Sequence, residues 1–325
     1  MGLWQKLSHV LLPEPPVEAS LAQAIDHAVG AVDPNLRMLS GLEHRLAPAI
    51  QTAMAYCAEL VAQLPPPLHV SHPAFASDPL VHALFASADD IDVMLGRSTA
   101  IRDFLEDGMN AFTEECYALL GMRRREKTMI GLAQQGDVIR GDVPLRYLYF
   151  TDHTLQQLAL TEDETRRRLQ ITAFDSLLQQ YAQVVAEQRR VRDEQRIAWD
   201  TERASGSGQM TPDEKAWRLS TLEAKYHEST ERLAPERILD GLVEWLETPQ
   251  QRLYLEPSSV TVDNMGMFVE PSEDRTDAHT LFCPQLVGRD RRKWTVILVR
   301  IARQEAWDAV EEQARQEQLM RSLWI

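Results

Sequence analysis

Hydrophobic residues recur at three- and four-residue intervals through most of the chain, which is the spacing of an amphipathic helix. Residues 20–63 carry two such stripes, and Pro48 is expected to kink or divide the second helix. Further stripes between residues 79 and 122 predict three more helices. The last of these three would carry Phe112, Cys116, Leu119 and Leu120. We therefore expect residues 17–122 to form an N-terminal helical bundle.

The pattern changes in two regions that are rich in aromatic and β-branched residues, which is typical of strands. The first, residues 123–152, predicts a hairpin that turns at Gly141-Asp142, although a helix over its first part remains an alternative. The second, residues 249–302, contains short apolar runs separated by turn residues. The run at 294–299 is apolar on both faces and predicts a central strand. The economical arrangement is one sheet built from both regions.

Between these regions, residues 153–248 predict a helical hairpin inserted into the sheet as an arm. A capping box at Thr161 starts a helix that nothing breaks before about Ala204. Successive apolar residues in this helix are three and four positions apart in alternation, as in a coiled coil. Beyond Val185, the residues at these positions are polar. A glycine-serine turn leads to a second helix with the same spacing. Helices joined by so short a turn are expected to lie antiparallel.

Both ends of the chain also predict helices. Residues 1–16 read as a short amphipathic helix and a proline-rich linker, and residues 303–325 as a final helix. Trp4 and Leu7 lie on the apolar face of the first helix, and Trp324 lies near the C-terminus. Packing onto the body is the favoured use of these residues. Docking to a partner protein and weak contact with a membrane surface are the alternatives.

Together these elements predict an α+β protein that is predominantly α-helical. Its parts would be an N-terminal helical bundle, a small β-sheet and a long antiparallel helical hairpin of the coiled-coil type. Hydrophobic residues make up 44% of the 325 residues, which is enough to bury a core.

Composition limits the partners and the compartment. The net charge is −15, and nucleic-acid affinity depends on neutralising phosphates with Lys and Arg. General nucleic-acid binding is therefore not expected, although a local basic patch could still bind. The three cysteines are far apart, and no apolar run reaches the length of about 18 residues that a membrane span needs. With no secretory signal recognisable, a cytoplasmic protein is expected.

The sequence contains no recognisable catalytic motif: a P-loop, a GxSxG elbow and a complete HExxH are all missing. Asp152-His153 would follow a strand and could act as an acid/base pair, but no nucleophile accompanies it. His69, His72 and His82 lie near several aspartates and could hold a metal, although helix capping and surface histidines explain them as well. We therefore predict no catalytic residues, no metal and no cofactor.

Two basic clusters stand out on this acidic background. They consist of Arg123, Arg124 and Arg125, and of Arg289, Arg291, Arg292 and Lys293. Arginine forks bind phosphate or carboxylate through two hydrogen bonds, so an anionic ligand is conceivable. If both clusters belong to one sheet, they could lie at the same end of it. The alternative is a solubilising turn that protects a sheet edge.

The leading hypothesis is a non-enzymatic scaffold or adaptor that binds a protein partner, or a second copy of itself, through the polar outer half of the arm. Trp199, Trp217 and Arg192 are the candidate contacts there, and the two tryptophans are expected to meet near the tip. The alternative is a regulatory domain that binds an anionic small molecule or lipid head group through the basic clusters. A third hypothesis is an enzyme with an unfamiliar site near Asp152 and His153.

Overall fold

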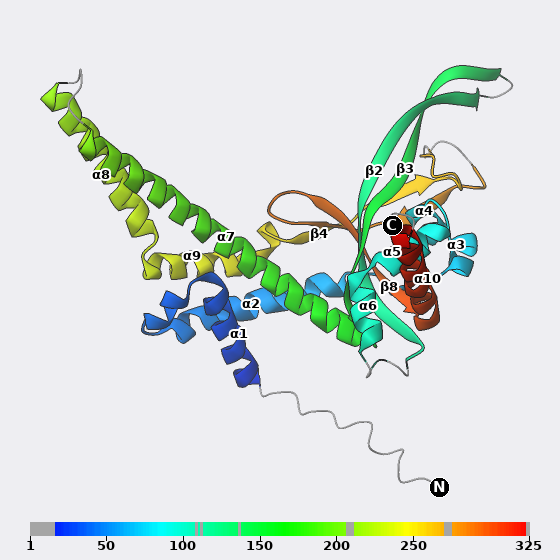
Figure 1. Ribbon diagram of the computed structural model, residues 1–325, viewed down its shortest axis with the longest axis horizontal. Coiled ribbons are helices and arrows are strands. Elements are labelled where there is room, and N and C mark those ends of the chain that lie inside the picture. The colour runs from blue at the N-terminus through cyan, green and yellow to red at the C-terminus, as the bar shows by residue number, and fades with distance from the viewer. Residues whose placement is uncertain are drawn as a thin grey trace, which may run out of the picture. The chain divides into compact units, whose positions relative to one another are not determined.

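The computed structural model describes residues 17–107, 110, 113–135, 138–205, 211–269 and 275–322 (Figure 1). The chain divides into two compact units. The first, here the helical unit, runs to Tyr56 and resumes at Ala173–Pro249. The second, the sheet unit, comprises Cys57–Thr172 and the residues from Gln250 onward. The predicted helix at residues 1–12, with Trp4 and Leu7, lies outside the described residues, as does Trp324.

The helical unit confirms the helices that periodicity predicts. Its elements are α1 (Val17–Val32), η2 (Pro34–Met38), α2 (Leu42–Ala62), α7 (Glu162–Ala204), α8 (Pro212–Arg232) and α9 (Pro235–Glu247). Both α2 and α7 continue into the sheet unit. Pro48 lies inside α2 without dividing it. A short 3₁₀ turn, η4 (Pro249–Gln251), follows α9.

The core of the helical unit includes contacts between α7 and α9. The buried stripe of α7 consists of Phe174, Leu177, Leu178, Tyr181 and Val185. The Tyr181 hydroxyl donates to the Ile238 carbonyl at 2.8 Å, and Trp245 Nε1 donates to the Leu177 carbonyl at 3.0 Å. Ile171, which the heptad pattern places on the apolar stripe, is 57% exposed, whereas Leu169 and Phe174 of the same helix are buried.

The sheet unit confirms that one sheet is built from both predicted strand regions. Its strands are β1 (Leu68–Val70), β2 (Glu115–Gln135), β3 (Val138–Ala159), β4 (Tyr254–Glu256), β5 (Ser259–Val262), β6 (His279–Phe282), β7 (Gln285–Val287) and β8 (Lys293–Ala302). Among the described residues the sheet order is β3-β2-β8-β7-β4, and β1 also pairs with β8, in parallel. The predicted central strand is β8, and β5 pairs with β6 separately.

Helices cover the sheet and contribute to its core. They are α3 (His72–Ser77), α4 (Pro79–Leu84), α5 (Asp89–Arg97), α6 (Thr99–Glu106) and α10 (Arg303–Ser322). Their apolar residues form one cluster with Cys116, Ala118, Leu120 and Met122 of β2. A second cluster joins Val61, Leu64 and Leu169 to Val296 and Leu298 of β8. Because neighbours on a strand point to opposite faces, β8 is buried on both sides.

Two local predictions in this region are wrong. Cys116, Leu119 and Leu120 lie on strand β2 and not on a third helix, because alternate residues face the core. The predicted turn at Gly141-Asp142 lies inside β3. The register slips between Gly131 and Ala133, so β3 carries one extra residue there and the ladder is locally irregular.

Residues 17–122, which are expected to form one helical bundle, are divided between the two units. The helices between residues 72 and 106 pack against the sheet and share its core. Helix α10 begins where the predicted final helix begins and is described as far as Ser322. No helix in the described ranges combines the length and the hydropathy that crossing a membrane requires.

Candidate functional site

The sheet unit contains a cleft of about 800 Å³, a volume in the range of small-ligand sites. Residues 75–86 around α4, residues 147–150 of β3, and the loop at residues 262–266 form its walls, together with His279. Its aromatic lining includes Phe75, Tyr147, Tyr149 and Phe150. The sequence offers little sign of this cleft, because its walls are far apart along the chain and each is unremarkable alone.

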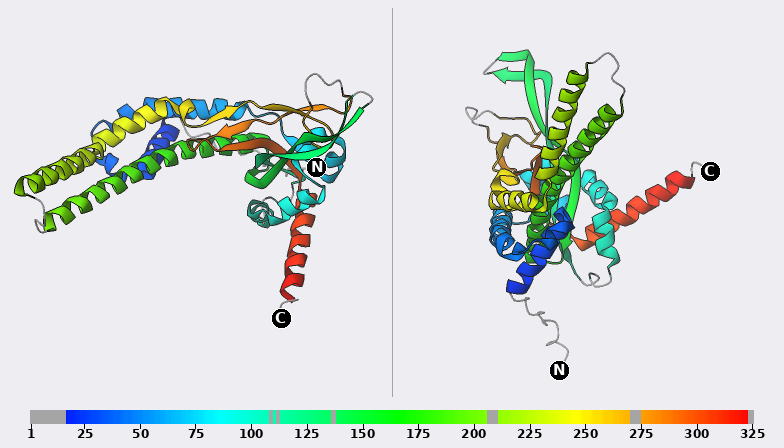
Figure 2. Two further views of the ribbon diagram at one scale, coloured as in Figure 1. Left: turned by 90° about the horizontal axis from the view of Figure 1, so that it is seen from above. Right: turned by 90° about the vertical axis from the view of Figure 1, so that its left-hand side faces the viewer.

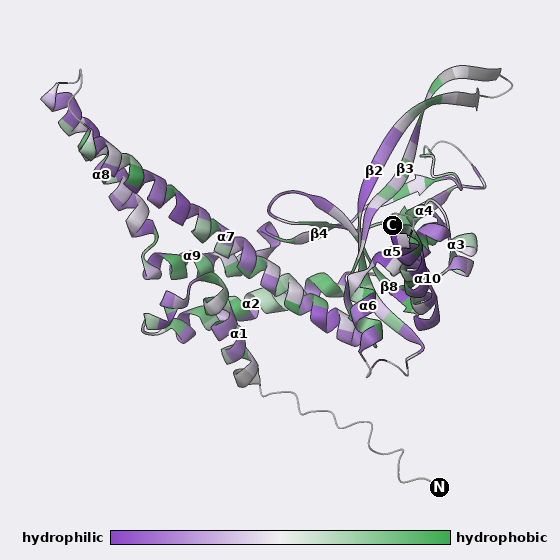
Figure 3. Ribbon diagram, viewed as in Figure 1, coloured by the Kyte–Doolittle hydropathy of each residue, from purple (hydrophilic) through white to green (hydrophobic). Residues whose placement is uncertain are grey.

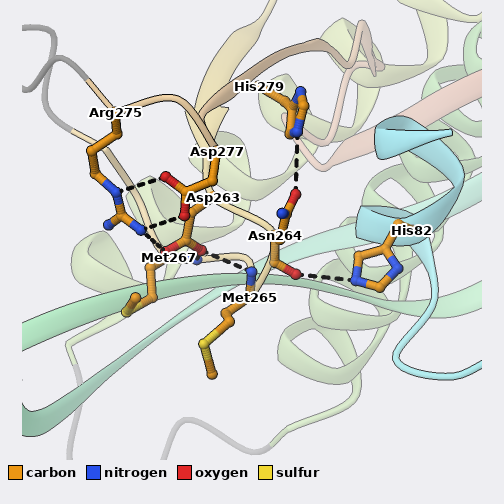
Figure 4. Close-up of polar contacts among 8 residues, drawn as sticks. All are labelled: His82, Asp263, Asn264, Met265, Met267, Arg275, Asp277 and His279. Atoms are coloured by element: carbon orange, nitrogen blue, oxygen red, sulfur yellow. Dashed lines mark hydrogen bonds and ion pairs between the residues drawn. The ribbon is translucent and has the colours of Figure 1, made fainter. Parts of the chain in front are cut away.

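A buried carboxylate shapes the loop on one side of the cleft (Figure 4). Asp263 Oδ1 accepts hydrogen bonds from the backbone N–H groups of Met265 and Met267, both at 2.9 Å. Its Oδ2 pairs with the guanidinium of Arg275 at 2.9 Å, and Arg275 also binds Asp277 at 2.7 Å. Asp263 is only 4% exposed, so these partners compensate the cost of burying its charge.

Two histidines from different segments contact the same loop residue (Figure 4). His82 Nε2 lies 3.0 Å from the Asn264 carbonyl, and His279 Nε2 lies 3.2 Å from Asn264 Oδ1. His82 Nδ1 is 3.2 Å from the Phe75 carbonyl, and the two rings are 4.7 Å apart. Both ring nitrogens of His82 therefore face backbone carbonyl oxygens. Neither nitrogen is directed at a molecule that would bind in the cleft.

The other polar groups of the cleft also have structural partners. Asp78 caps α4 by accepting hydrogen bonds from the backbone of Leu80 and Val81, and the Ser77 hydroxyl donates to the Pro73 carbonyl. This arrangement suits the binding of a partly apolar molecule and lacks the nucleophile–base contact that acyl transfer needs. No group of three or more His, Cys, Asp or Glu in the described part of the chain is arranged to hold a metal ion.

The residues considered for catalysis are not brought together. Asp152 and His153 lie within β3 rather than after it, so the predicted position is wrong. Asp152, with a positive φ of 58°, faces Arg123 at 3.5 Å. His153 Nε2 bonds the Leu84 carbonyl at 2.8 Å, and its ring stacks on Phe85. Each residue has a separate structural partner.

The three histidines considered for a metal also separate. His72 Nε2 pairs with Asp92 Oδ2 at 2.9 Å, whereas His82 lies in the cleft and His69 lies on β1. The cysteines are unsuited to reactivity, since burial raises the pKa of the Cys116 thiol to about 12 and that of the Cys283 thiol to about 11.

The register of the sheet brings the two basic clusters to the same end. Met122 pairs with Thr295, and the Arg123 guanidinium lies 4.8 Å from the centre of the Trp294 ring, beside the second cluster. Several of these cations are already paired. Arg124 binds Glu126 at 2.9 Å and Ser258 at 3.2 Å. Arg292 lies 3.3 Å from Asp290, and Lys293 binds Glu256 at 2.6 Å. Arg291 has a positive φ of 57°, and Arg289 is exposed in the same turn.

Helices α7 and α8 run antiparallel side by side (Figures 1 and 2), but their tryptophans do not meet. Trp199 stacks on Tyr226, with ring centres 6.0 Å apart, whereas Trp217 is 71% exposed. The reason is helical geometry: Tyr226 belongs to the half-buried stripe of α8 and Trp217 does not. Arg192 binds its neighbour Asp193 at 2.8 Å.

Comparison with protein family models, with curated proteins and with solved structures finds no match for this chain. Three surfaces therefore remain as candidates on geometry alone. They are the cleft, the end of the sheet that carries the basic clusters, and the exposed part of the α7–α8 pair.

Proposed function

We propose that the protein is a non-enzymatic scaffold that acts through protein–protein contacts. The docking surface is the outer hairpin, defined as residues 188–205 of α7 and 211–232 of α8, in a coiled-coil-like arrangement. One observation supports this most directly: α8 buries none of its residues, although it lies along α7. A helix usually owes its stability to an apolar face packed in a core, so α8 has unused capacity for pairing.

The contacts inside the outer hairpin are polar and incomplete. Beyond Val185, the contacts between the helices include the ring stack of Trp199 on Tyr226 and an ion pair of 3.2 Å between Glu202 and Arg218. Glu202 Oε1 and Gln195 Oε1 are buried without a hydrogen-bond partner in the described part of the chain. Buried polar atoms without partners cost free energy, so this seam stabilises the hairpin less than an apolar one would.

We assign a second copy of the chain as the occupant of this surface. The outer hairpin carries equal numbers of acidic and basic residues, unlike the whole chain with its net charge of −15. Two outer hairpins related by a twofold axis can therefore pair opposite charges without net repulsion. The exposed apolar residues Ile197 and Trp217 would provide the apolar contacts.

Sedimentation velocity of the full chain and of Trp217→Ala tests this proposal. Removing a central aromatic anchor is expected to raise the dimer dissociation constant by at least about tenfold, since such residues contribute about 2 kcal/mol or more. Trp307→Ala is the matched control, because Trp307 is also exposed, at 40%, but lies on α10. Deleting residues 188–232, which removes the whole outer hairpin, and joining Glu187 to Leu233 with a short turn should give a monomer, since the Glu202–Arg218 pair places Glu187 opposite Leu233. A wild-type chain that is monomeric at high concentration would refute the proposed pairing.

The second candidate function is a regulatory domain that binds an anionic small molecule or a lipid head group. The contact of Arg123 with Trp294 favours it, since it joins the two basic clusters on one sheet. Thermal unfolding with and without inorganic pyrophosphate provides the test, and the stabilisation should disappear in Arg292→Ala. An unchanged melting temperature for the wild type would reject this candidate.

A further inference from the structure

Past the end of the pairing between β2 and β8, strands β2 and β3 continue as a paired ribbon (Figure 1), and Met267 forms a bridge with β3 at Tyr147. The ladder between β2 and β8 ends at Met122, whereas the pairing with β3 continues to Gln135. Because side chains alternate along a strand, Arg123, Arg125 and Lys127 share one face of this ribbon. The register places Tyr149 opposite Arg125 and Tyr147 opposite Lys127, on that same face. We call these five residues the cationic ribbon face.

Of the three cations on this face, Arg123 is paired with Asp152, whereas the other two are not paired with a carboxylate in the described part of the chain. Arg125 and Lys127 are exposed, and neither has an ion pair within the described ranges. The acidic residue between them, Glu126, points to the other face, where it binds Arg124 at 2.9 Å and Arg146 at 2.5 Å. These hydrogen bonds lower the pKa of the Glu126 carboxyl. Figure 3 shows the hydrophilic character of β2 in this part of the ribbon.

We propose that the cationic ribbon face binds single-stranded nucleic acid. The guanidinium of Arg125 and the ammonium of Lys127 bind successive phosphates, and the ring of Tyr149 stacks on a base. Cations two residues apart on a strand are separated by roughly 6.5 Å, which is similar to the spacing of phosphates along an extended strand. The inference goes beyond the second candidate function, since it uses a neighbouring part of the same basic region for a polymeric ligand that carries bases.

The aromatic residues of this face favour a single-stranded nucleic acid over other polyanions. Tyr149 is 42% exposed, beside an unpaired cation. Unpaired bases stack on exposed aromatic rings, and this contributes about 1–3 kcal/mol per base. A duplex keeps its bases stacked inside, and an acidic peptide offers charge without bases. The acidic body repels phosphates, so binding should be strong only at low ionic strength.

Fluorescence anisotropy with a labelled short oligothymidylate tests the inference on the full chain. Affinity is measured from about 50 to about 200 mM salt, over which phosphate contacts weaken steeply. The double variant Arg125→Ala/Lys127→Ala should bind at least tenfold more weakly. It should also have a salt slope smaller by about 1.4, since each phosphate contact contributes about 0.7 for single strands. Tyr149→Ala should bind about five- to hundredfold more weakly with an unchanged slope.

The control removes the same charge elsewhere in the sheet unit. Arg315→Ala/Arg321→Ala removes two positive charges from α10, where both residues are exposed. This control should bind like the wild type, and all the variants should melt like the wild type because the replaced side chains are exposed. Equal weakening in the control would show that only overall charge matters and would overturn the inference.

Three further results would also overturn it. These are absence of binding at the lowest salt, equal binding of a duplex or of poly-glutamate, and an unchanged affinity in Tyr149→Ala. Stabilisation by pyrophosphate without binding of the oligonucleotide would retain the second candidate function while rejecting this inference. The sedimentation test of dimer formation is independent of the pyrophosphate and oligonucleotide tests.

Discussion

Replacing Asp263 with asparagine tests whether one buried carboxylate holds the loop beside the cleft. The asparagine oxygen can still accept from the N–H groups of Met265 and Met267, but its amide group now faces the Arg275 guanidinium. The lost bond is charge-assisted and worth about 1.5–3 kcal/mol. Since Arg275 keeps its contact with Asp277, it is not left as an unpaired charge, and we expect a loss of about 2 kcal/mol.

The assay combines thermal unfolding with hydrogen exchange of the loop amides. A loss of about 2 kcal/mol corresponds to a melting temperature lower by about 4–8 °C for a unit of roughly 150–250 residues. The amides of Met265 and Met267 should exchange faster than in the wild type, because their acceptor loses its charge. Asp277→Asn is the control: its side chain is 41% exposed, and a surface pair contributes about 0–1 kcal/mol. Equal effects of the two substitutions, or unchanged exchange in the loop, would refute the reasoning.

The remaining predictions concern packing and pH. Gly96→Ala places a Cβ 2.6 Å from the Ala309 carbonyl oxygen, so α10 must shift. We expect urea unfolding to show a loss of stability of about 1–2 kcal/mol. An unchanged free energy of unfolding would contradict this close approach. Tyr181→Phe removes the bond to the Ile238 carbonyl and should cost about 1 kcal/mol in the same assay. In the wild type, burial raises the Tyr181 pKa to about 12, so its phenolate absorbance should be missing at pH 10. The pKa of Glu126 is lowered from its usual 4.5, so its contribution to stability is present above pH 4.5 and is lost below that pH. The melting difference between the wild type and Glu126→Gln should therefore shrink as the pH falls below 4.5, and a constant difference would count against the ion pairs.

Several elements could be predicted because their signals are local. The Thr161 hydroxyl accepts the N–H of Glu164 at 3.2 Å, as the capping box predicts, and Thr211 and Glu214 form a complete box at the start of α8. The doubly apolar run at residues 294–299 becomes the central strand β8. These signals depend on neighbours within about one helical turn or one strand, so the sequence contains all the information that they need.

Other elements could not be predicted, because distant residues decide them. The segment that begins at Cys116 has apolar residues compatible with a helix, but pairing with β8 makes it a strand. A short apolar run does not distinguish the two periods by itself. Trp199 was expected to meet Trp217, and the alignment of α7 with α8 gives it Tyr226 instead.

The helical periods, the caps, the doubly apolar central strand and the acidic background with its two basic clusters all follow from the amino-acid sequence. The sequence does not show that Tyr147 and Tyr149 lie opposite Lys127 and Arg125, or that His82 and His279 both contact Asn264. The physical reason is that helix periods and caps are set by interactions within a few residues. A cleft or a binding face is set by strand register and by packing between separate segments of the chain, which no local sequence pattern predicts.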